Sequence, residues 1–495
     1  MLTTKAYEFW FVTGSQLLYG EDVLRQVEEN SKTIVNGLAD DSAVTYKLIF
    51  KSVVKDSDSI RKLILEANAD ENCAGIITWM HTFSPSKMWI AGLSALQKPY
   101  LHLATQFNRD IPWDSIDMDF MNLNQAAHGD REHGFIAARM KVKRKVVVGH
   151  WENQEVRERV GSWMRTAAAF QESKSLKVAR FGDNMREVAV TEGDKVEAQI
   201  KFGWTVNGYG VGDLVQRMND VTEQEIDQLM AEYDEQYDIT PEGRNSGPVR
   251  DAIRYQARIE LGMKAFLTEG GYTAFTTTFE DLHGIRQLPG LAVQRLMEQG
   301  YGFAGEGDWK TAALVRLMKI IAGNEGTSFM EDYTYHFEPG NEMVLGSHML
   351  EVCPTISATR PRIEVHPLGI GGKEDPARIV FNGKGGLSAL NATIVDLGHR
   401  FRLLVNEVDS VEIEKDMPKL PVARVLWKTQ PSLSQAVENW IQAGGAHHTG
   451  FSYKVTVEQL RDFAELAGIE FLLINNDTNT HAFTNEIRWN NVIFR

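Results

Sequence analysis

Alternating strand-like and helical segments are the feature that most restricts the fold of this chain. Over residues 8–149, short apolar runs are separated by stretches with helical periodicity. The strand-like runs are Glu8–Thr13, Val44–Phe50, Gly75–Trp79, Tyr100–Ala104 and Val146–Gly149. Strands that alternate with helices predict a parallel sheet wound by helices on both faces. We therefore expect a doubly wound, Rossmann-like α/β domain over residues 1–175.

At 495 residues the chain is too long for one hydrophobic core, and further domains are expected. A second α/β domain is predicted over 176–325, with Ala198–Phe202 among its strands and a Gly-, Pro- and Asn-rich loop at 240–248. Over 326–495 the pattern changes to short β-rich segments separated by Gly, Pro and Asp turns. This pattern predicts a β-rich, barrel-like C-terminal domain.

Charge and cysteine content limit the partners and the compartment. The formal net charge of -15 is spread along the chain, which argues against a nucleic-acid partner or an anionic membrane surface and fits a neutral or cationic small molecule. The two cysteines, Cys73 and Cys353, exclude a disulfide framework and a Cys-rich zinc site. No apolar run reaches the roughly 18 residues needed to span a bilayer, and no secretory signal opens the chain. We expect a cytoplasmic protein.

Glu306 lies between an apolar strand and a helix. The segment Tyr301–Ala304 predicts the end of a strand, and Asp308–Ile321 predicts a helix with Asp308 as its N-cap. A carboxylate in the loop after a strand occupies the place where open α/β sheets bind ligands. The alternative is that Glu306 only stabilises the helix N-terminus through the helix dipole.

Four more residues of metal-ligand type accompany Glu306. Glu331 stands in TSFMEDYTYHF, His348 in VLGSHMLEVCP, and His447 and His448 follow two glycines in a predicted loop. Two carboxylates and two imidazoles suit Mn²⁺, Co²⁺ or a related divalent ion that keeps positions open for substrate oxygens. A histidine pair beside glycines can equally be structural, and the sequence pattern leaves that open.

Other catalytic motifs are incomplete. GYGVGD at 208–213 and GIGGK at 369–373 complete neither the dinucleotide fingerprint nor the phosphate-binding P-loop, so turns are expected there. No G-x-S-x-G nucleophile elbow is present. Cys353 follows an apolar stretch and is expected to be a buried, unreactive thiol.

A set of motifs spans the whole chain. It includes WFVTGSQLLYG, HTFSPSKMWI, TTTFEDLHG, GYGFAGEGDWKTAAL, TSFMEDYTYHF, LGSHMLEVCP and AGGAHHT. These motifs resemble those of the L-arabinose isomerases. The resemblance implies a cytoplasmic enzyme of L-arabinose catabolism that converts L-arabinose to L-ribulose, with D-galactose to D-tagatose as a side activity. It also implies Mn²⁺ as cofactor, with Co²⁺ as a possible substitute, and a homohexamer built from two trimers.

The same resemblance implies roles for individual residues. The metal ligands would be Glu306, Glu331, His348 and His448, with His447 as the alternative to His448. The two glutamates would also transfer protons. The residues that would bind the sugar are Gln16, Tyr19, Met185, Phe279, Ile370 and, from a neighbouring subunit, His128.

Three other classes of protein deserve comparison. An aldose-ketose isomerase of the fucose type would share the architecture and differ in its substrate profile. A nicotinamide-dependent dehydrogenase fits the α/β alternation but lacks the dinucleotide fingerprint. A non-catalytic sugar-binding protein could have paired α/β lobes, but it would not need two glutamates and two histidines.

Overall fold

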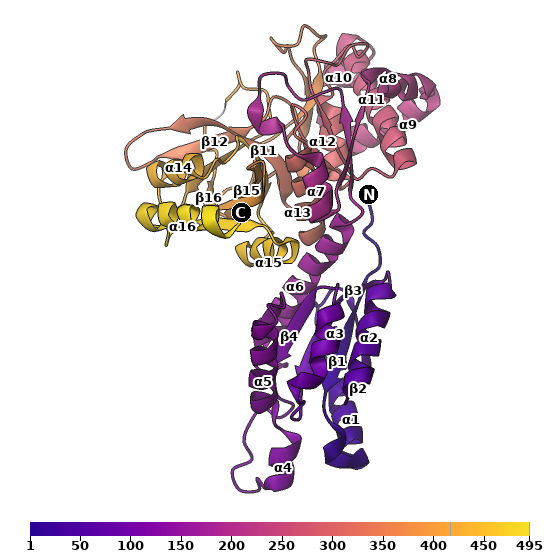
Figure 1. Cartoon of the computed structure of the whole chain (residues 1–495). Helices are drawn as coiled ribbons and strands as arrows, with labels where there is room; N and C mark the ends of the chain where they lie inside the picture. The colour runs from indigo at the N-terminus through magenta and orange to yellow at the C-terminus, as the bar shows by residue number, and fades with distance from the viewer. Residues whose placement is uncertain (416, 495) are drawn as a thin grey trace. The chain divides into compact units, whose positions relative to one another are not determined.

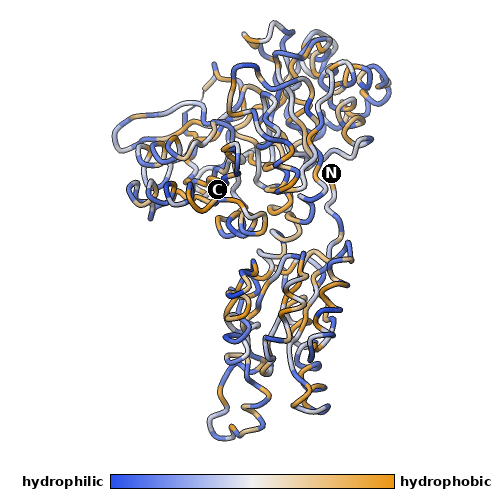
Figure 2. The backbone as a smooth tube through the Cα atoms, in the orientation of Figure 1, coloured by the Kyte–Doolittle hydropathy of each residue, from blue (hydrophilic) through white to orange (hydrophobic). Residues whose placement is uncertain are grey.

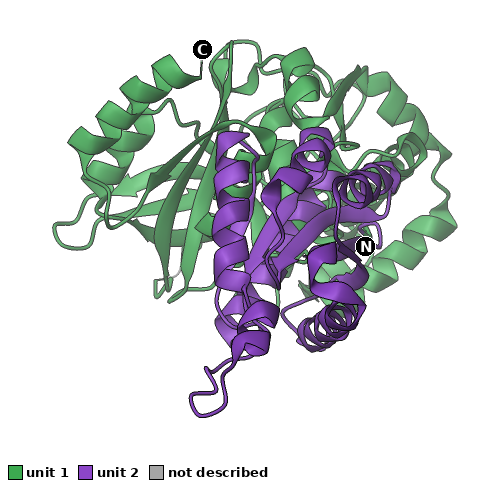
Figure 3. Cartoon of the chain, turned by 60° about the horizontal axis from the view of Figure 1, so that its bottom comes forward, with its two compact units in different colours: residues 1–3, 172–495 green, residues 4–171 purple. Residues whose placement is uncertain are grey.

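Figure 1 shows the computed structural model of the chain, which describes residues 1–415 and 417–494. The chain divides into two compact units, one of residues 4–171 and one of residues 1–3 and 172–495 (Figure 3). Among the described residues, no helix is both long enough and apolar enough to cross a membrane.

A five-stranded parallel sheet forms the centre of the unit of residues 4–171. Its strands lie in the order β2-β1-β3-β4-β5. The strands are β1 (Glu8–Gly14), β2 (Lys47–Val54), β3 (Cys73–Met80), β4 (Tyr100–Ala104) and β5 (Lys145–Val148). The helices are η1 (Leu17–Tyr19), α1 (Gly20–Ala39), α2 (Ser57–Ala69), η2 (Ser86–Trp89), α3 (Ile90–Ala95), α4 (Met118–Leu123), α5 (Ala126–Arg139) and α6 (Gln154–Ser173). This strand order is flavodoxin-like, with its topological switch point between β1 and β3.

Side chains of β1 pack alternately on the two faces of this sheet. Phe9 and Phe11 share a core with residues of α1 and α6, and Trp10 and Val12 share another with residues of α2, α3 and α5. Because successive strand residues point to opposite faces, a continuous apolar run is buried on both sides. Figure 2 shows these apolar strands inside the unit. The predicted doubly wound arrangement is confirmed.

A second parallel sheet, in the order β10-β9-β6-β7, follows in the other unit. Its strands are β6 (Lys177–Phe181), β7 (Thr205–Tyr209), β9 (Ala274–Thr277) and β10 (Gly302–Ala304). The helices of this part are η3 (Ala189–Thr191), α7 (Lys195–Phe202), α8 (Val211–Asp220), α9 (Glu223–Gln236), α10 (Pro241–Arg244), α11 (Pro248–Gly270), α12 (Gly290–Glu298) and α13 (Trp309–Ile321). The second α/β region predicted from the sequence is therefore present.

Three local predictions in this part are wrong. In place of the turn expected at 208–213, β7 ends at Tyr209 and α8 begins at Val211. Residues 198–202 were expected to form a strand but belong to α7, because Asp194 caps the helix by accepting from two backbone N–H groups. Gly203, with φ of 84°, then ends the helix in the left-handed conformation that glycine permits. The predicted loop at 240–248 contains the short helix α10, which begins at a proline, where the missing N–H costs no helical hydrogen bond.

A seven-stranded sheet dominates residues 326–494, in the order β15-β18-β11-β12-β17-β16-β19, and β15 also pairs with β16. Its strands are β11 (Thr327–His336), β12 (Met343–Ser347), β15 (Ser388–Asp396), β16 (Phe401–Val411), β17 (Arg424–Thr429), β18 (His448–Ser452) and β19 (Glu470–Ile474). A small sheet joins β8 (Asp238–Ile239), β13 (Arg362–Val365) and β14 (Ala377–Val380). The helices are η4 (Pro354–Ile356), α14 (Leu433–Gln442), α15 (Val457–Ala467) and α16 (Thr480–Ile493). The strand-rich character predicted for this region is confirmed.

Helix α13 connects the parallel sheet to the strand-rich sheet. All 13 of its residues are buried. It contacts β9 and β10 on one side and β11, β15 and β18 on the other. As predicted, Asp308 is its N-cap and accepts a hydrogen bond from Thr311 N. The loop that carries Glu306 therefore lies where the two sheets meet.

Candidate active site

Glu306 lies in the loop between β10 and α13, as the sequence predicted. Its φ is 61°, in the left-handed region that side chains other than glycine rarely adopt. The loop is fixed from both sides: Glu306 O accepts from Met185 N at 2.9 Å, and Gly307 N donates to Thr277 O at 3.2 Å. Backbone strain of this kind persists where the surrounding structure holds it, and it concentrates at functional sites.

The antiparallel pairing of β11 with β12 and β18 brings distant residues together. Glu331 in β11 is paired with His448 in β18 and with Ser347 in β12. Directly opposed residues have Cα atoms about 4.5–5.5 Å apart, so Glu331, His448 and His348, which follows Ser347, are neighbours. His448 begins a strand, which corrects the expectation that the histidine pair lies wholly in a loop.

Glu306, His348 and His448 form a cluster in which one possible ligand atom from each lies within 4.8 Å of the others. Nε2 of His448 is 3.8 Å from Oε2 of Glu306, and Nε2 of His348 is 4.0 Å from Oε2 of Glu331. Nε2 of His447 lies 3.7 Å from the same Glu306 oxygen. The His448 side chain is fully buried, whereas that of His447 is 36% exposed. Both members of the histidine pair thus lie near Glu306, in different surroundings.

Each of the two buried imidazoles has a carboxylate on its other ring nitrogen. Nδ1 of His348 is 2.5 Å from Glu351 Oε2, and Nδ1 of His448 is 3.2 Å from Asp308 Oδ2. A carboxylate in this position fixes the tautomer and orientation of a metal-ligating histidine. Nε2 of His448 is buried without a hydrogen-bond partner among the described residues. These observations fit a divalent metal held by mixed oxygen and nitrogen ligands.

The charges of the cluster are interdependent. Burial lowers the pKa of His348, but the carboxylate of Glu351, with those of Glu331 and Glu306, outweighs burial and raises that pKa to about 8. Burial raises the pKa of Glu306, but the neighbouring imidazoles, with His447 first, outweigh burial and hold that pKa below its usual value. The ionised carboxylates of the cluster attract a cation, and His348 must lose its proton before it can bind one.

A cavity of about 360 Å³ opens at the cluster, within the size range of small-molecule sites. The sequence-predicted residues that line it are Glu306, Glu331, His348, Met185, Phe279 and Ile370. Other lining residues were not predicted from the sequence, and they include Thr277, Leu282, Leu288, Tyr333, Met349 and Glu351. Glu351 follows His348 by three residues, and this spacing was the available signal.

Gln16, Tyr19 and His128 belong to the unit of residues 4–171, and none is among the described residues that line this cavity. Gln16 follows β1, and His128 stands in the first turn of α5. Tyr19 Oη donates to Gln125 Oε1 at 3.5 Å, and the His128 ring stacks on Phe83 with centroids 4.2 Å apart. Phe83 follows β3, so these groups lie at the carboxyl ends of β1 and β3, where a doubly wound sheet binds ligands. Phe83 and Gln125 were not predicted as site residues from the sequence.

Parallel α/β sheets are joined to a strand-rich sheet, and carboxylates and the His348 imidazole line one cavity beside the buried His448. These features define an α/β enzyme with a candidate metal site. Three family models match the chain in succession: the L-arabinose isomerase N-terminal domain at residues 3–175, the central domain at 177–324 and the C-terminal domain at 326–470. The chain belongs to the L-arabinose isomerase family and is an isomerase.

Individual relatives are similar over their whole length. The L-arabinose isomerase of Geobacillus stearothermophilus is 72% identical over 495 residues, with 100% of both chains covered. That of Bacillus subtilis (strain 168) is 64% identical, covering 100% of this chain and 99% of the relative. That of Clostridium beijerinckii is 61% identical, with 100% of both chains covered.

Proposed function

We propose that this isomerase converts L-arabinose to L-ribulose in the 360 Å³ cavity. The observation that carries the proposal is that Glu306, Glu331 and His348 line one small-molecule cavity, with the buried His448 3.8 Å from Glu306 and paired with Glu331 across the sheet. The names of the full-length relatives support the choice of substrate. We also propose D-galactose to D-tagatose as a side activity and a role in L-arabinose catabolism.

We propose Glu306, Glu331, His348 and His448 as ligands of Mn²⁺, with Co²⁺ as a possible substitute. The buried, unpartnered Nε2 of His448 and the carboxylate behind each imidazole support this set. His447 remains the alternative to His448, because its Nε2 lies as near to Glu306. When bound, the cation supplies the Lewis acidity that polarises the carbonyl of the open-chain sugar.

The chain's own residues then move the protons. One of Glu306 and Glu331 removes the proton from C2 as a general base, and the other transfers a proton between O1 and O2 by way of an enediol. Both carboxylates line the cavity, so both can reach a sugar bound there. Phe279 and Ile370 line the same cavity and restrict the access of water to the reacting carbons.

We propose a homohexamer of two trimers, in which His128 serves the active site of a neighbouring subunit, and we propose Gln16 and Tyr19 as further sugar-binding residues. Exposed apolar side chains on the unit that carries them support association, since Leu18 is 83% exposed and Trp113 79% exposed. Mixing His128→Ala subunits with Glu306→Gln subunits should then restore activity, because some sites pair an intact His128 with an intact Glu306. No recovery in verified mixed oligomers would contradict a role between subunits.

We propose three further features of the protein. The division into domains at 1–175, 176–325 and 326–495 is supported by the three family matches, which cover residues 3–175, 177–324 and 326–470. A barrel-like C-terminal domain is supported by the pairing of β15 with both β18 and β16. A cytoplasmic location without nucleic-acid partners is supported by two buried free cysteines and the net charge of -15.

A ketose assay on a panel of aldoses tests the proposal. Protein stripped of metal should be inactive, and refilling with Mn²⁺ should restore turnover with L-arabinose as the preferred aldose. Preference for L-fucose would favour a fucose-type isomerase, and sugar-dependent reduction of a nicotinamide would favour a dehydrogenase. Full activity without metal would refute the assigned chemistry.

A further inference from the structure

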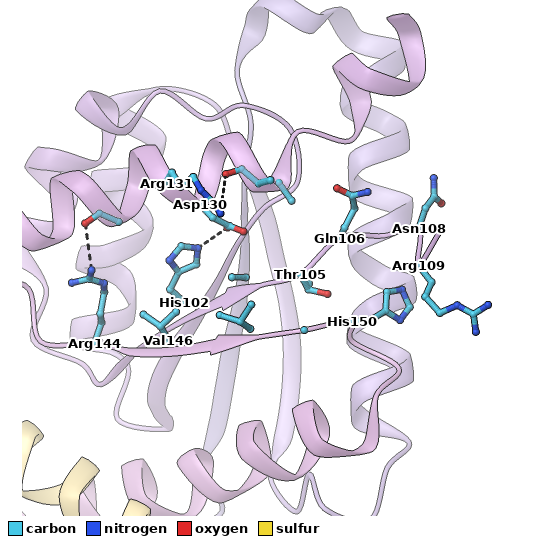
Figure 4. A pocket seen from close by; sticks show the side chains of 16 residues that line it. His102, Thr105, Gln106, Asn108, Arg109, Asp130, Arg131, Arg144, Val146 and His150 are labelled. Atoms are coloured by element: carbon cyan, nitrogen blue, oxygen red, sulfur yellow. Dashed lines mark hydrogen bonds and ion pairs between the residues drawn. The ribbon is translucent and has the colours of Figure 1, made fainter. Parts of the chain in front are cut away.

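The cavity shown in Figure 4, of about 690 Å³, lies in the unit of residues 4–171, over β4 and β5 and beneath the first turns of α5. Its cationic side chains do not converge on one ligand. Arg131 and Arg144 donate to backbone carbonyl oxygens about two turns apart on α5, and Arg109 at the other end is paired with Asp110 at 2.7 Å. A more specific arrangement of reactive groups lies in the other unit, where a lysine contacts a cysteine.

Lys319 and Cys353 lie side by side in the interior of the unit that contains the candidate active site. Lys319 is in the last turn of α13, and Cys353 lies between β12 and η4. Nζ of Lys319 is 3.4 Å from Sγ of Cys353, and the two residues are 1% and 0% exposed. The burial of Cys353 was expected from its apolar sequence context. The contact with a lysine 34 positions away was not, because the fold creates it.

The hydrogen-bond partners of this lysine amine in the described part of the chain carry no fixed negative charge. Nζ of Lys319 donates to Thr327 O at 3.0 Å and to Asn324 Oδ1 at 3.3 Å, in addition to the thiol. By contrast, Nζ of the buried Lys310 lies 3.4 Å from the carboxylate of Asp308. Burial lowers the pKa of Lys319 and outweighs the opposite effect of the thiol. Lys319 therefore loses its proton more readily than an exposed lysine and presents a nucleophilic amine to the sulfur.

A cavity of about 520 Å³ lies next to this pair. Two of its lining residues, Asn324 and Thr355, are half-buried and also contact the amine and the thiol. Asn324 accepts a hydrogen bond from Nζ of Lys319, and Thr355 Oγ1 is 3.3 Å from Sγ of Cys353. The thiol is thus one side chain away from the cavity, and a small oxidant needs only a small movement of Thr355 to reach the sulfur.

We propose that Lys319 and Cys353 form a redox-sensitive covalent cross-link, a sulfenamide bond between Nζ and Sγ, with a peroxide as the oxidant. In the first step the sulfur attacks one oxygen of hydrogen peroxide, the O–O bond breaks, the thiol becomes a sulfenic acid, and water leaves. In the second step the lone pair of Nζ attacks the sulfur, the S–O bond breaks, and hydroxide leaves as water with a proton from the amine. The sulfur gives up two electrons, and one peroxide is reduced to two molecules of water.

The arrangement of the two side chains favours the second step. Nζ already lies in hydrogen-bond contact with Sγ, so the amine and the sulfenic acid are held together in advance. The flexible four-carbon side chain of lysine lets Nζ approach the sulfur while α13 stays in place. A thiol reductant reverses the reaction by attacking the sulfur, which restores the amine and the thiol.

Peptide mapping of the assembled protein after exposure to hydrogen peroxide tests the proposal. The peroxide concentration is one that oxidises exposed methionine side chains. We expect a peptide containing Lys319 joined to one containing Cys353, lighter by two hydrogen atoms than their sum and absent after treatment with a thiol reductant. Recovery of Cys353 only as a free thiol, or only as its sulfinic or sulfonic acid, overturns the proposal. A cross-link that retains an oxygen atom between the two side chains overturns the sulfenamide assignment.

Cys73 is a matched control within the same chain. It is also 0% exposed, but its Sγ donates to Gly75 O at 3.6 Å and has no lysine in hydrogen-bond contact among the described residues. Burial raises the pKa of the Cys73 thiol to about 11. Cys73 should therefore stay free of cross-links under the same conditions. Cross-linking of Cys73 to the same extent as Cys353 would show that buried thiols react generally, and it would overturn the assignment.

Two variants test the role of each side chain. Lys319→Met removes the nucleophile and keeps an unbranched side chain, so the cross-link should be lost and Cys353 should continue to the sulfinic acid, which thiol reductants do not restore. Cys353→Ala should lose the cross-link without affecting the recovery of Lys319. Thermal melts check that each variant is folded, and the comparison with Cys73 in the unmodified protein does not depend on either variant. Reversible oxidation of Cys353 that persists in Lys319→Met would overturn the proposal.

Discussion

Replacing Gly305 by alanine should damage the metal site, because the added methyl group would crowd the imidazole of His348. A Cβ atom at Gly305 would lie 2.9 Å from Cε1 and 3.0 Å from Nε2 of His348, where ordinary contact begins at 3.4 Å. The imidazole would have to retreat by about half an ångström, from 2.9 to 3.4 Å. It is held from other directions by Glu351 at 2.5 Å and by the Phe329 ring, whose centroid lies 4.9 Å away. The added methyl group therefore forces either His348 or the Glu306 loop out of place.

The expected loss follows from the role of this contact. Disturbing the residues that orient a metal ligand typically lowers metal affinity about 10- to 100-fold, equivalent to about 1.4 to 2.8 kcal/mol. Overpacking should also destabilise the fold by about 1–3 kcal/mol. The measurements are calorimetric Mn²⁺ titration of metal-free protein and kcat with saturating metal.

Gly212 provides a matched control for this substitution. It lies in helix α8, and a Cβ atom there would meet nothing within 4 Å. Gly212→Ala should leave metal affinity unchanged and stabilise the helix by up to about 1 kcal/mol. Unchanged Mn²⁺ affinity in Gly305→Ala, or an equal loss in Gly212→Ala, would refute the reasoning.

Three further predictions concern proton transfer, metal affinity and stability. Glu306→Gln and Glu331→Gln should each lower kcat by about 10²- to 10⁴-fold. Turnover of the unmodified protein in D₂O should place some deuterium at C1 of the ketose. Near-normal kcat in either variant would contradict proton transfer by these carboxylates. Since the pKa of His348 is raised from 6.5 to about 8, protons should compete with the metal below that pH, so Mn²⁺ affinity should rise with pH and level off above about 8. The same raised pKa increases the free energy of unfolding of the metal-free protein. This contribution is complete below pH 6.5 and is lost as the pH rises through about 8. Denaturant unfolding at several pH values will measure it.

The sequence predicted the site where its signals are local. The apolar segment before Glu306 and the capping residue Asp308 lie within a few positions of each other, so strand, loop and helix could be assigned correctly. The helix at 195–202 was missed although its signals, Asp194 before it and Gly203 after it, were present. There the short apolar run at 198–202 was given more weight than the flanking caps.

The remaining features of the site depend on pairing between distant segments. Glu331 and His448 meet because β11 and β18 are neighbours, and no local pattern encodes a register across more than a hundred residues. The positive φ of Glu306 is likewise set by the segments packed against its loop. Asp308 was predicted as a helix cap, but its contact with His448 depends on the same sheet pairing.

The location of the metal in active crystals tests the central claim most directly. Crystals loaded with Mn²⁺ and measured near its absorption edge should give one anomalous peak per chain, in contact with Glu306, Glu331 and His348. The fourth ligand should be Nε2 of His448, and a contact from His447 in its place would correct that assignment alone. A peak away from these glutamates, in crystals that still convert L-arabinose to L-ribulose, would contradict the account.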